Sequence, residues 1–280
     1  MKQFILSREP EGGIVRLDGG DYRYLVRVRR LATGEYFPAL LPDGAETLVR
    51  VLSVENGVLT GKCAESDVRG ATPHGASPSL ILFQALPKGE KMDLIVRQAA
   101  EGGITEIVPF VSEFSVAKTG AGGQKFSRWE RIIKEARQQS GSKTATVIRQ
   151  PLTINGLFEY WKKLKESCAS GGPLGGTKGG APDRALGLLF HHEARQGLEQ
   201  ESLHRYLDSV PEITAFAIGP EGGFSGGEVS LFMENGFKTL TIGDTILRTE
   251  TAALYCAAAI KILLLERNSW ELKQVKTVSG

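Results

Sequence analysis

Cysteine is scarce in this chain of 280 residues: only Cys63, Cys168 and Cys256 occur, and they lie far apart. No two of them have the Cys-x-x-Cys spacing of a zinc site or a redox motif, and three scattered cysteines do not make a disulfide framework. The scarcity suits a reducing compartment, and we expect neither a disulfide nor a metal ion.

An excess of charge of one sign and a long apolar run are also missing. The 34 Lys and Arg residues against 32 Asp and Glu leave a formal net charge of +2, so any affinity for nucleic acid must come from local clusters. The longest apolar stretch, residues 252–265, is interrupted by Lys261 and is too short to cross a bilayer. Residues 1–6 lack the apolar run of a signal peptide. We therefore expect a cytoplasmic protein without a membrane contact.

Short strands separated by turn signals occupy the start of the chain. The expected strands are residues 14–17, 36–41, 47–54 and 58–63, with the turn sequences Pro42-Asp43-Gly44 and Asn56-Gly57 between the later ones. A helical patch over residues 21–31 interrupts them. The pattern predicts a small β-barrel, and residues 70–78 have the composition of a linker.

Strands alternate with helices after the linker, which predicts an α/β domain with a mostly parallel sheet and helices on both faces. The expected order is strand 80–85, helix 91–101, strand 104–110, helix 127–139, strand 186–190, strand 213–219, helix 226–235, strand 239–242 and helix 251–265. Residues 168–183 (CASGGPLGGTKGGAPD) are rich in glycine and are interpreted as a flexible surface insertion.

A glycine-rich loop, residues 219–223 (GPEGG), stands between an expected strand and an expected helix. Open α/β sheets bind ligands at this place, and glycines let a ligand approach the backbone. The loop has neither the Walker A nor the G-x-G-x-x-G pattern. Ser225 and Glu228 fit a capping box, which explains part of the motif without any ligand. A ligand-binding loop is favoured because a cap alone does not require these glycines.

The same segment contains G-x-S-x-G around Ser225, the pattern of the nucleophile elbow of α/β-hydrolases. In those enzymes the catalytic histidine follows the serine in the chain. The histidines of this chain are His74, His191, His192 and His204, and all precede Ser225. A hydrolase would therefore lack its base. The pair His191-His192 has no Cys, Asp or Glu at ligand spacing, so it is interpreted as structural or pocket-lining.

A second stretch, residues 243–252 (GDTILRTETA), also stands between a strand and a helix. Thr249 or Thr251 could cap that helix, and Glu250 suits the positive end of the helix dipole. Arg248 does not suit it, because the dipole disfavours a cation there. We therefore expect Arg248 to be directed at a ligand or an anion.

Basic residues form two clusters that indicate RNA binding, although solvated helix faces are often basic as well. Arg23, Arg27 and Arg30 recur at a spacing that places them on one helix face. The second cluster consists of Lys118, Lys125, Arg128, Arg131, Lys134, Arg137, Lys143 and Arg149.

Two of these stretches closely resemble the signature of a known family. Residues 218–225 (IGPEGGFS) and 242–252 (IGDTILRTETA) resemble the RsmE family of small-subunit ribosomal RNA uracil-N3 methyltransferases, which belongs to the SPOUT class. Further matches are residues 88–92 (KGEKM), Glu101, Gly103, Pro109, Ser112-Glu113, Gln139-Ser140-Gly141, Gly34 and Asp43-Gly44. The resemblance spans nearly the whole chain.

The resemblance implies an α/β fold in two domains: a PUA-like RNA-binding β-barrel over residues 1–72, then a SPOUT methyltransferase domain over residues 76–280 with a C-terminal deep trefoil knot. It implies S-adenosyl-L-methionine as cofactor, N3 of a uridine in 16S ribosomal RNA of the small subunit as target, and a homodimer formed through the knot region. The residues implied to bind the cofactor are Phe190, His191, Ile218, Gly219, Pro220, Glu221, Gly222, Ile242, Gly243, Ile246, Leu247, Thr249 and Ala252. The expected RNA contacts are Arg23, Arg27, Arg30, Lys88, Lys91, Arg128 and Arg131.

Arg248 and Glu250 are the expected catalytic residues. A cation near O2 or O4 of uracil would stabilise the anion formed when N3 loses its proton, and Glu250 could accept that proton or orient Arg248. The sequence departs from the family at Gln3, Tyr24, Gln98, Gln138 and Ser142. These departures keep two alternatives open: a non-catalytic RNA-binding or assembly factor on the same fold, and a SPOUT methyltransferase with another RNA target.

Overall fold

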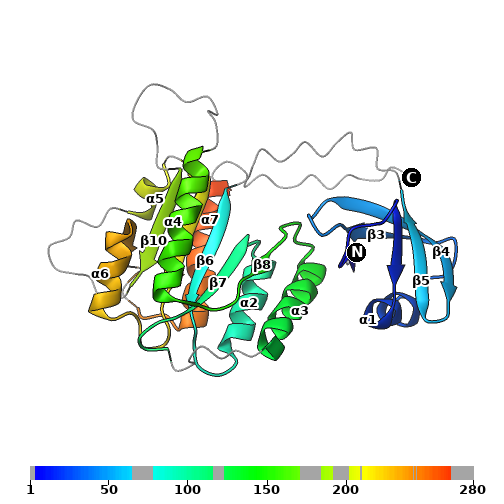
Figure 1. The fold of residues 1–280 in the computed structure, drawn as a ribbon, viewed down its shortest axis with the longest axis horizontal. Helices are drawn as coiled ribbons and strands as arrows, with labels where there is room; N and C mark the ends of the chain where they lie inside the picture. The colour runs from blue at the N-terminus through cyan, green and yellow to red at the C-terminus, as the bar shows by residue number, and fades with distance from the viewer. Residues whose placement is uncertain are drawn as a thin grey trace.

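Two units make up the described part of the chain, an N-terminal unit built on a sheet and a larger α/β unit (Figure 1). The computed structural model describes residues 4–64, 78–115, 123–170, 184–191, 202–208, 210–241, 243 and 245–265. The predicted linker therefore lies almost wholly outside the described residues, and the predicted domain boundaries stay a prediction.

The N-terminal unit is a curled five-stranded sheet with the strand order β1-β3-β4-β5-β2. Its elements are β1 (Phe4–Ile5), β2 (Ile14–Leu17), α1 (Gly19–Tyr22), the π-helical turn η1 (Arg23–Val28), β3 (Tyr36–Leu40), β4 (Glu46–Glu55) and β5 (Val58–Cys63). The four predicted strands are confirmed to within one residue at each end. Their inward residues, such as Phe37, Val49 and Leu59, are fully buried around Leu25 of η1.

The predicted helix over residues 21–31 was too long. Helical structure ends at Val28, and Arg30 has a φ of 57°, in the left-handed region. Arg30 therefore does not continue the helical face that carries Arg23 and Arg27, although all three side chains are exposed.

The α/β unit has a parallel sheet with the strand order β12-β10-β11-β6-β7-β8, and the short β9 also pairs with β7. Its elements are β6 (Ser79–Ala85), α2 (Lys91–Glu101), β7 (Glu106–Val111), α3 (Gly123–Ser140), β8 (Val147–Ile148), β9 (Leu152–Thr153), α4 (Ile154–Ser170), β10 (Ala185–Phe190), α5 (Leu203–Tyr206), β11 (Ile213–Ile218), α6 (Gly226–Glu234), β12 (Phe237–Leu240) and α7 (Thr249–Leu265). The predicted α/β class with a parallel sheet is confirmed.

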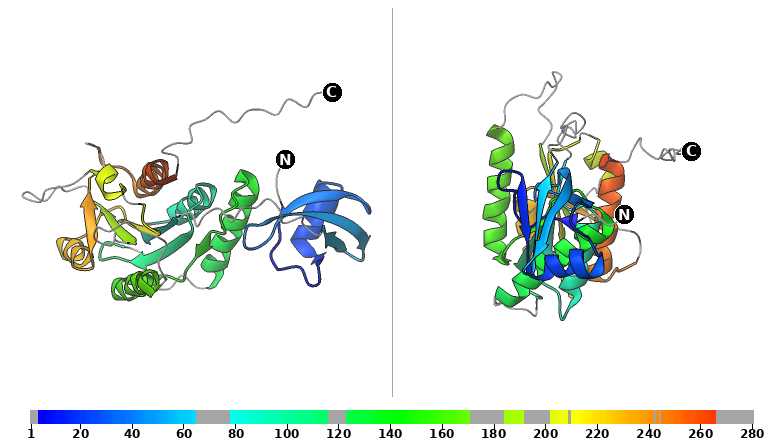
Figure 2. Two further views of the ribbon diagram at one scale, coloured as in Figure 1. Left: turned by 90° about the horizontal axis from the view of Figure 1, so that it is seen from above. Right: turned by 90° about the vertical axis from the view of Figure 1, so that its right-hand side faces the viewer.

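Helices cover both faces of this sheet (Figure 2). Alternate residues of β6 point to opposite faces: Leu80 and Leu82 join the core under α2, α3 and α7, whereas Ile81 and Phe83 join the core under α4 and α6. Because all strands run parallel, the carboxyl ends of β10, β11 and β12 meet at one edge, where Phe190 lies opposite both Ile218 and Leu240.

Several boundaries differ from prediction. α3 begins at Gly123 instead of residue 127, α7 begins at Thr249 instead of residue 251, and β7 begins at Glu106 instead of residue 104. The last strand lies two residues earlier than expected, at Phe237–Leu240, because Phe237 packs in the core beneath α6. The predicted insertion begins too early, because Cys168 is buried at the end of α4; its residues 171–183 lie outside the described residues.

The two units meet along α3. Lys134 on α3 forms an ion pair with Asp21 at 2.9 Å and donates a hydrogen bond to Ser7 Oγ at 2.7 Å. Lys143, just after α3, forms an ion pair with Glu46 of β4 at 3.1 Å. The turn before β4 lies against the same place, since a Cβ on Gly44 would be 2.1 Å from the carbonyl oxygen of Lys143.

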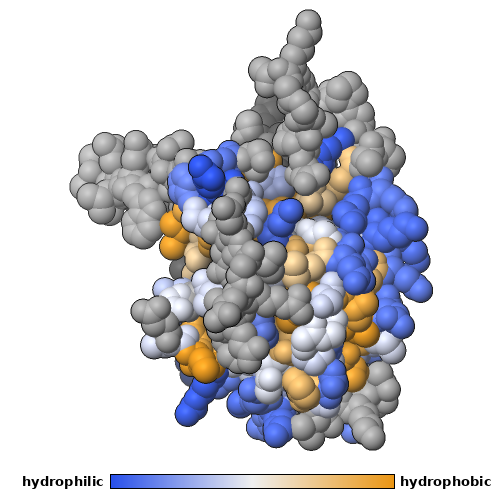
Figure 3. All heavy atoms as spheres, turned by 90° about the vertical axis from the view of Figure 1, so that its left-hand side faces the viewer, coloured by the Kyte–Doolittle hydropathy of each residue, from blue (hydrophilic) through white to orange (hydrophobic). Residues whose placement is uncertain are grey.

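The surface at the end of the molecule opposite the N-terminal unit carries apolar patches separated by hydrophilic side chains (Figure 3). Among the described residues, every helix is too short or too polar to cross a membrane.

Candidate active site

A cavity of about 530 Å³ opens where β10, β11 and β12 end and α7 begins. Its walls include all but one of the residues implied to bind a cofactor: Phe190, His191, Ile218, Gly219, Pro220, Glu221, Gly222, Gly243, Ile246, Leu247, Thr249 and Ala252. The remaining one, Ile242, lies outside the described residues. The fold thus brings the two sequence motifs to one place, and what they bind there stays a prediction.

The glycine loop after β11 is a tight turn that has little room for side chains. The Gly223 N–H donates to the carbonyl oxygen of Pro220 at 2.9 Å, and Gly223 has a φ of 70°. A Cβ on Gly219 would lie 3.1 Å from the Gly223 backbone, and one on Gly222 would lie 3.0 Å from Cβ of Phe114. The glycines therefore allow the loop to close on itself and to pack against Phe114.

The capping box at Ser225 is confirmed. Ser225 Oγ accepts from the Glu228 N–H at 3.3 Å, and the Ser225 N–H donates to the Glu228 carboxylate at 3.0 Å. The Ser225 hydroxyl oxygen is therefore occupied in starting α6, which gives a structural reason against its use as a nucleophile.

The sequence allowed Thr249 to cap α7. Instead, Thr249 is the first residue of α7, and its side chain connects this helix to the glycine loop by a hydrogen bond. Its hydroxyl donates to the carbonyl oxygen of Gly219 at 2.7 Å and accepts from Gln84 Nε2 at 3.0 Å. Gln84, at the end of β6, is fully buried and Thr249 is 4% exposed. The two sequence motifs are therefore joined by a buried hydrogen-bond chain, which the sequence did not indicate.

Lys91 lies at the wall of the cavity between two carboxylates. Its Nζ is 2.8 Å from Glu221 and 3.6 Å from Glu250. The hydrogen bond with Glu221 raises the pKa of Lys91 above its ordinary value, and burial opposes this only in part. For Glu221, burial favours a higher pKa, but hydrogen bonds from Lys91 and from the backbone N–H of Lys88 outweigh it and lower the pKa. Both groups therefore stay charged near neutral pH.

The two predicted catalytic residues differ in exposure. Arg248 is exposed at the cavity wall, and its side chain forms no ion pair with any residue that the structure describes. The Glu250 side chain is only 14% exposed, and its buried Oε2 accepts no hydrogen bond from the described part of the chain. The cavity wall therefore presents the exposed cation of Arg248, whereas Glu250, two residues further on, is not among the residues that line the cavity.

Most cations of the second basic cluster form ion pairs with acidic residues of the protein or are buried. Arg128 pairs with Asp93 at 2.5 Å, Arg131 with Glu135 at 3.7 Å, Lys134 with Asp21, Lys143 with Glu46 and Arg149 with Glu106, while Arg137 is buried. Lys118 lies outside the described residues. The RNA contacts predicted for Arg128 and Arg131 stay predictions, but the cluster as a whole is largely neutralised.

The sequence profile of the RNA methyltransferase domain family matches residues 75–261, and the chain belongs to this family. Among curated proteins it is similar to "Ribosomal RNA small subunit methyltransferase E 2" of Borreliella burgdorferi, with 29% identity over 96% of this chain and 100% of the relative. The protein named "Ribosomal RNA small subunit methyltransferase E" in Synechocystis is 29% identical over 89% of this chain and 73% of its own length. The predicted resemblance to the RsmE family is confirmed.

Solved structures share the fold. A ribosomal RNA small subunit methyltransferase E from Neisseria gonorrhoeae, bound to S-adenosyl methionine, matches with a TM-score of 0.68 and 23% identity, covering 94% of this chain and 98% of that one. A methyltransferase from Legionella pneumophila, also in complex with this cofactor, matches with a TM-score of 0.70 and 24% identity over 93% of this chain and 96% of that one.

Proposed function

We propose that this protein uses S-adenosyl-L-methionine to methylate N3 of a uridine in 16S ribosomal RNA, and that it acts in the cytoplasm on the small ribosomal subunit. The observation that carries the proposal is the cavity at three parallel strand ends, where both family motifs meet in a chain of the RNA methyltransferase family. The relatives that carry the name ribosomal RNA small subunit methyltransferase E support the substrate.

The residues around the cavity fit this cofactor. Its size of about 530 Å³ lies within the range of small-molecule sites. The glycine loop lines one side of the cavity, and the apolar walls at Phe190, Ile246 and Leu247 suit a nucleoside. When bound, the cofactor supplies a sulfonium methyl group that is open to nucleophilic attack.

The chain's own residues then accept the N3 proton of the uracil and stabilise the negative charge that forms on the base. Methyl transfer forms a bond from N3 to carbon, breaks the carbon–sulfur bond and leaves a neutral thioether. The N3 proton must go to a base, and the proposed acceptor is the carboxylate of Glu250, whose Oε2 lies 3.6 Å from Lys91 Nζ. Arg248 stabilises the negative charge on O2 or O4 of the uracil. The base must be unpaired or flipped, because N3 lies on its Watson–Crick edge.

The proposal is tested with purified protein, small ribosomal subunits that lack the modification, and isotopically labelled S-adenosyl-L-methionine. We expect N3-methyluridine in the digested rRNA by mass spectrometry, and saturable cofactor binding by calorimetry. A label on another nucleoside would identify a methyltransferase with another RNA target. Absence of cofactor binding would identify a non-catalytic RNA-binding or assembly factor.

Two further proposals concern the fold of the two units. We infer that the chain between β12 and α7 is threaded into the C-terminal trefoil knot of the SPOUT class, and that the N-terminal sheet closes as a PUA-like barrel for RNA contact. The parallel order β12-β10-β11 and the curled N-terminal sheet support them.

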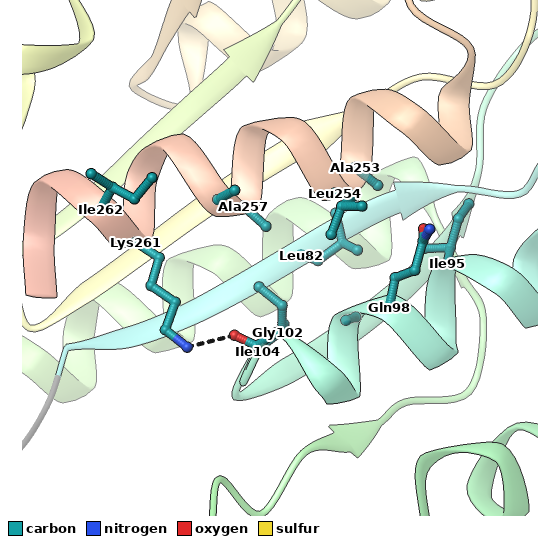
Figure 4. Close-up of a pocket in the computed structure, with 12 residues that line it drawn as sticks. Leu82, Ile95, Gln98, Gly102, Ile104, Ala253, Leu254, Ala257, Lys261 and Ile262 are labelled. Atoms are coloured by element: carbon teal, nitrogen blue, oxygen red, sulfur yellow. Dashed lines mark hydrogen bonds between the residues drawn. The ribbon is translucent and has the colours of Figure 1, made fainter. Parts of the chain in front are cut away.

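We also propose that the protein is a homodimer formed through α2 and α7. A cavity of about 270 Å³ lies between these helices and is lined mainly by apolar side chains, among them Leu254 and Ala257 (Figure 4). On α7, Leu254 is 42% exposed and Ile262 is 40% exposed, and both lie on one stripe of the helix. A second copy would cover this stripe in a symmetric contact.

The oligomeric state is measured by light scattering. We expect a dimer for the wild type and a monomer for Leu254→Asp. Leu231→Asp is the matched control, because Leu231 is 37% exposed on α6. A dimer that survives Leu254→Asp would contradict this assignment.

A further inference from the structure

The outward face of the N-terminal sheet carries a row of side chains that the proposed chemistry does not use. Tyr36 on β3 lies directly opposite Arg50 on β4, and Arg50 lies opposite Lys62 on β5. Cross-strand partners point to the same side of a sheet, so these three side chains share one face. Their neighbours Phe37 and Val49 point to the core instead, and a Cβ on the third neighbour, Gly61, would meet the core residues Val49 and Val15.

This face is unusually apolar for the solvent side of a sheet, where polar residues are the rule. Tyr36 is 55% exposed, Leu48 is 44% exposed and Leu52 is 41% exposed. They flank Arg50, whose guanidinium carbon lies 6.0 Å from the centre of the Tyr36 ring. Tyr36, Leu48, Arg50, Leu52 and Lys62 are called the Tyr36 platform below.

The charge of the platform is positive. Arg50 and Lys62 form no ion pair with any residue that the structure describes, and Arg16 on the adjacent β2 is likewise exposed and unpaired there. Within β4 the carboxylates stand at the two ends of the strand, Glu46 and Glu55, and Glu46 is neutralised by Lys143. β4 runs from this junction with α3 toward the far end of the N-terminal unit (Figure 1).

We propose that the Tyr36 platform binds an unpaired stretch of RNA, with one base stacked on the Tyr36 ring and the flanking phosphates held by Arg50 and Lys62. Aromatic rings beside cations on an open surface are the means by which proteins hold single strands, because every base has a face to stack. A second copy of the chain is a poorer occupant, since a symmetric contact would bring the cations together. This proposal rests on the proposed function, because it assigns part of the RNA substrate to a surface.

The platform differs from the RNA surface that the sequence indicated. Arg23 and Arg27 lie on the helical turns, which pack against the inner side of the same sheet through Leu25. The platform lies on the opposite, outer side, and it supplies the stacking ring that a purely basic helix face lacks.

The test measures fluorescence anisotropy of a labelled single-stranded RNA of about 12 nucleotides, with a duplex of the same sequence as comparison. We expect Tyr36→Ala to weaken single-strand binding about 10-fold without changing its salt dependence, and Tyr36→Phe to bind as the wild type does. Arg50→Gln should weaken binding and lower the slope of log affinity against log salt by about 0.7. Lys163→Gln, which removes an exposed cation on α4, is the control for total charge.

Wild-type binding by Tyr36→Ala would overturn the proposal, as would equal losses for single strand and duplex. A changed molar mass of Tyr36→Ala in light scattering would also overturn it, in favour of a contact between copies. Failure of the proposed function has a different signature: the wild type would then not bind S-adenosyl-L-methionine, whereas the platform variants would still differ in RNA binding.

Discussion

Arg248 stands at the entrance of α7, where the helix dipole disfavours a cation. Its backbone carbonyl accepts the first helical hydrogen bond, from Ala252 N–H at 2.8 Å, while its side chain is exposed at the cavity wall and forms no ion pair with the described residues. A position that is costly for the helix is thus occupied by a side chain available to a ligand.

Replacing Arg248 by Ala should leave cofactor affinity within several-fold of the wild type and lower methyl transfer by about 100-fold or more, because a donor to the developing uracil anion is lost. Arg248→Lys keeps the charge and should recover part of the rate. Calorimetry with S-adenosyl-L-methionine and single-turnover methylation separate the two effects. Normal turnover in Arg248→Ala would remove this residue from the mechanism.

Tyr160 illustrates a residue that serves the fold rather than the chemistry. Its hydroxyl donates to Glu106 at 2.6 Å, and Arg149 lies over its ring at 4.2 Å while also pairing with Glu106. Burial, reinforced by the hydrogen bond to Glu106, raises the pKa of Tyr160 from 10.0 to about 12. The fold therefore favours the neutral phenol.

This shift predicts a pH-dependent contribution to stability. Below pH 10 the phenol is neutral in both states, so the wild type should be more stable than Tyr160→Phe by about 1.5 kcal/mol. As the pH rises from 10 toward 12, the unfolded chain loses this proton first, and the advantage should shrink. Urea unfolding of both proteins at several pH values measures it. A difference that stays constant across this range would show that Tyr160 does not titrate as expected.

At the scale of elements, the site depends on how α7 is attached to the glycine loop after β11. Thr249 makes this connection, because its buried hydroxyl donates to the Gly219 carbonyl oxygen and accepts from the Gln84 amide. Thr249→Val keeps the shape and removes both hydrogen bonds. We expect a loss of about 1–3 kcal/mol in the free energy of unfolding and weaker cofactor binding. Thr251→Val, an exposed threonine one half-turn further along α7, is the matched control and should change neither by much.

Much of this element-level arrangement follows from the sequence. Apolar alternation and turn residues located the strands, and the spacing of glycines located the loop after β11. The predicted elements do not include α4, although Leu157, Phe158 and Trp161 recur at helical spacing and are buried. This apolar spacing is the feature of the sequence that predicts a helix there.

Other features of the site were beyond sequence reasoning. Gln84 and Thr249 are 165 positions apart, so no local pattern connects them. The RNA contact predicted for Lys91 stays a prediction. Because β6 pairs with β11, the start of α2 also lies at the edge of the sheet where the glycine loop lies, and Lys91 pairs there with Glu221. The order of the strands in the sheet places Lys91 at the cavity. That order cannot be read from the residue pattern of a single sequence.

At the scale of the whole molecule, the contact between the two units fixes the position of the N-terminal unit relative to the cavity. Their contact includes the ion pairs of Lys134 with Asp21 and of Lys143 with Glu46. Arg137 lies beside this contact and is only 6% exposed, and its Nε and one terminal nitrogen have no hydrogen-bond partner among the described residues. Burial lowers the pKa of Arg137. Such a buried, unsatisfied cation costs stability, so the junction is held by its shape and by the ion pairs around it.

A substitution at Gly44 disturbs the contact between the two units without removing a charged side chain. Its φ is 92°, and an added Cβ would collide with the carbonyl oxygen of Lys143. Gly34 has the same φ of 92°, but nothing lies within 4 Å of its added Cβ, so Gly34→Ala reports the backbone strain alone. Gly44→Ala should therefore separate the two units where Gly34→Ala does not, and small-angle scattering should show a larger radius of gyration.

The functional consequence follows from the positions of the two surfaces. The cavity proposed for the cofactor is lined by residues of the α/β unit, so cofactor affinity should be equal in Gly44→Ala and Gly34→Ala. An RNA held by both units would be presented to Arg248 less accurately after separation, and methylation of the ribosomal subunit should fall in Gly44→Ala about 10-fold or more below Gly34→Ala. Equal methylation by the two variants would mean that the units act through a flexible connection, with the α/β unit alone positioning the uridine.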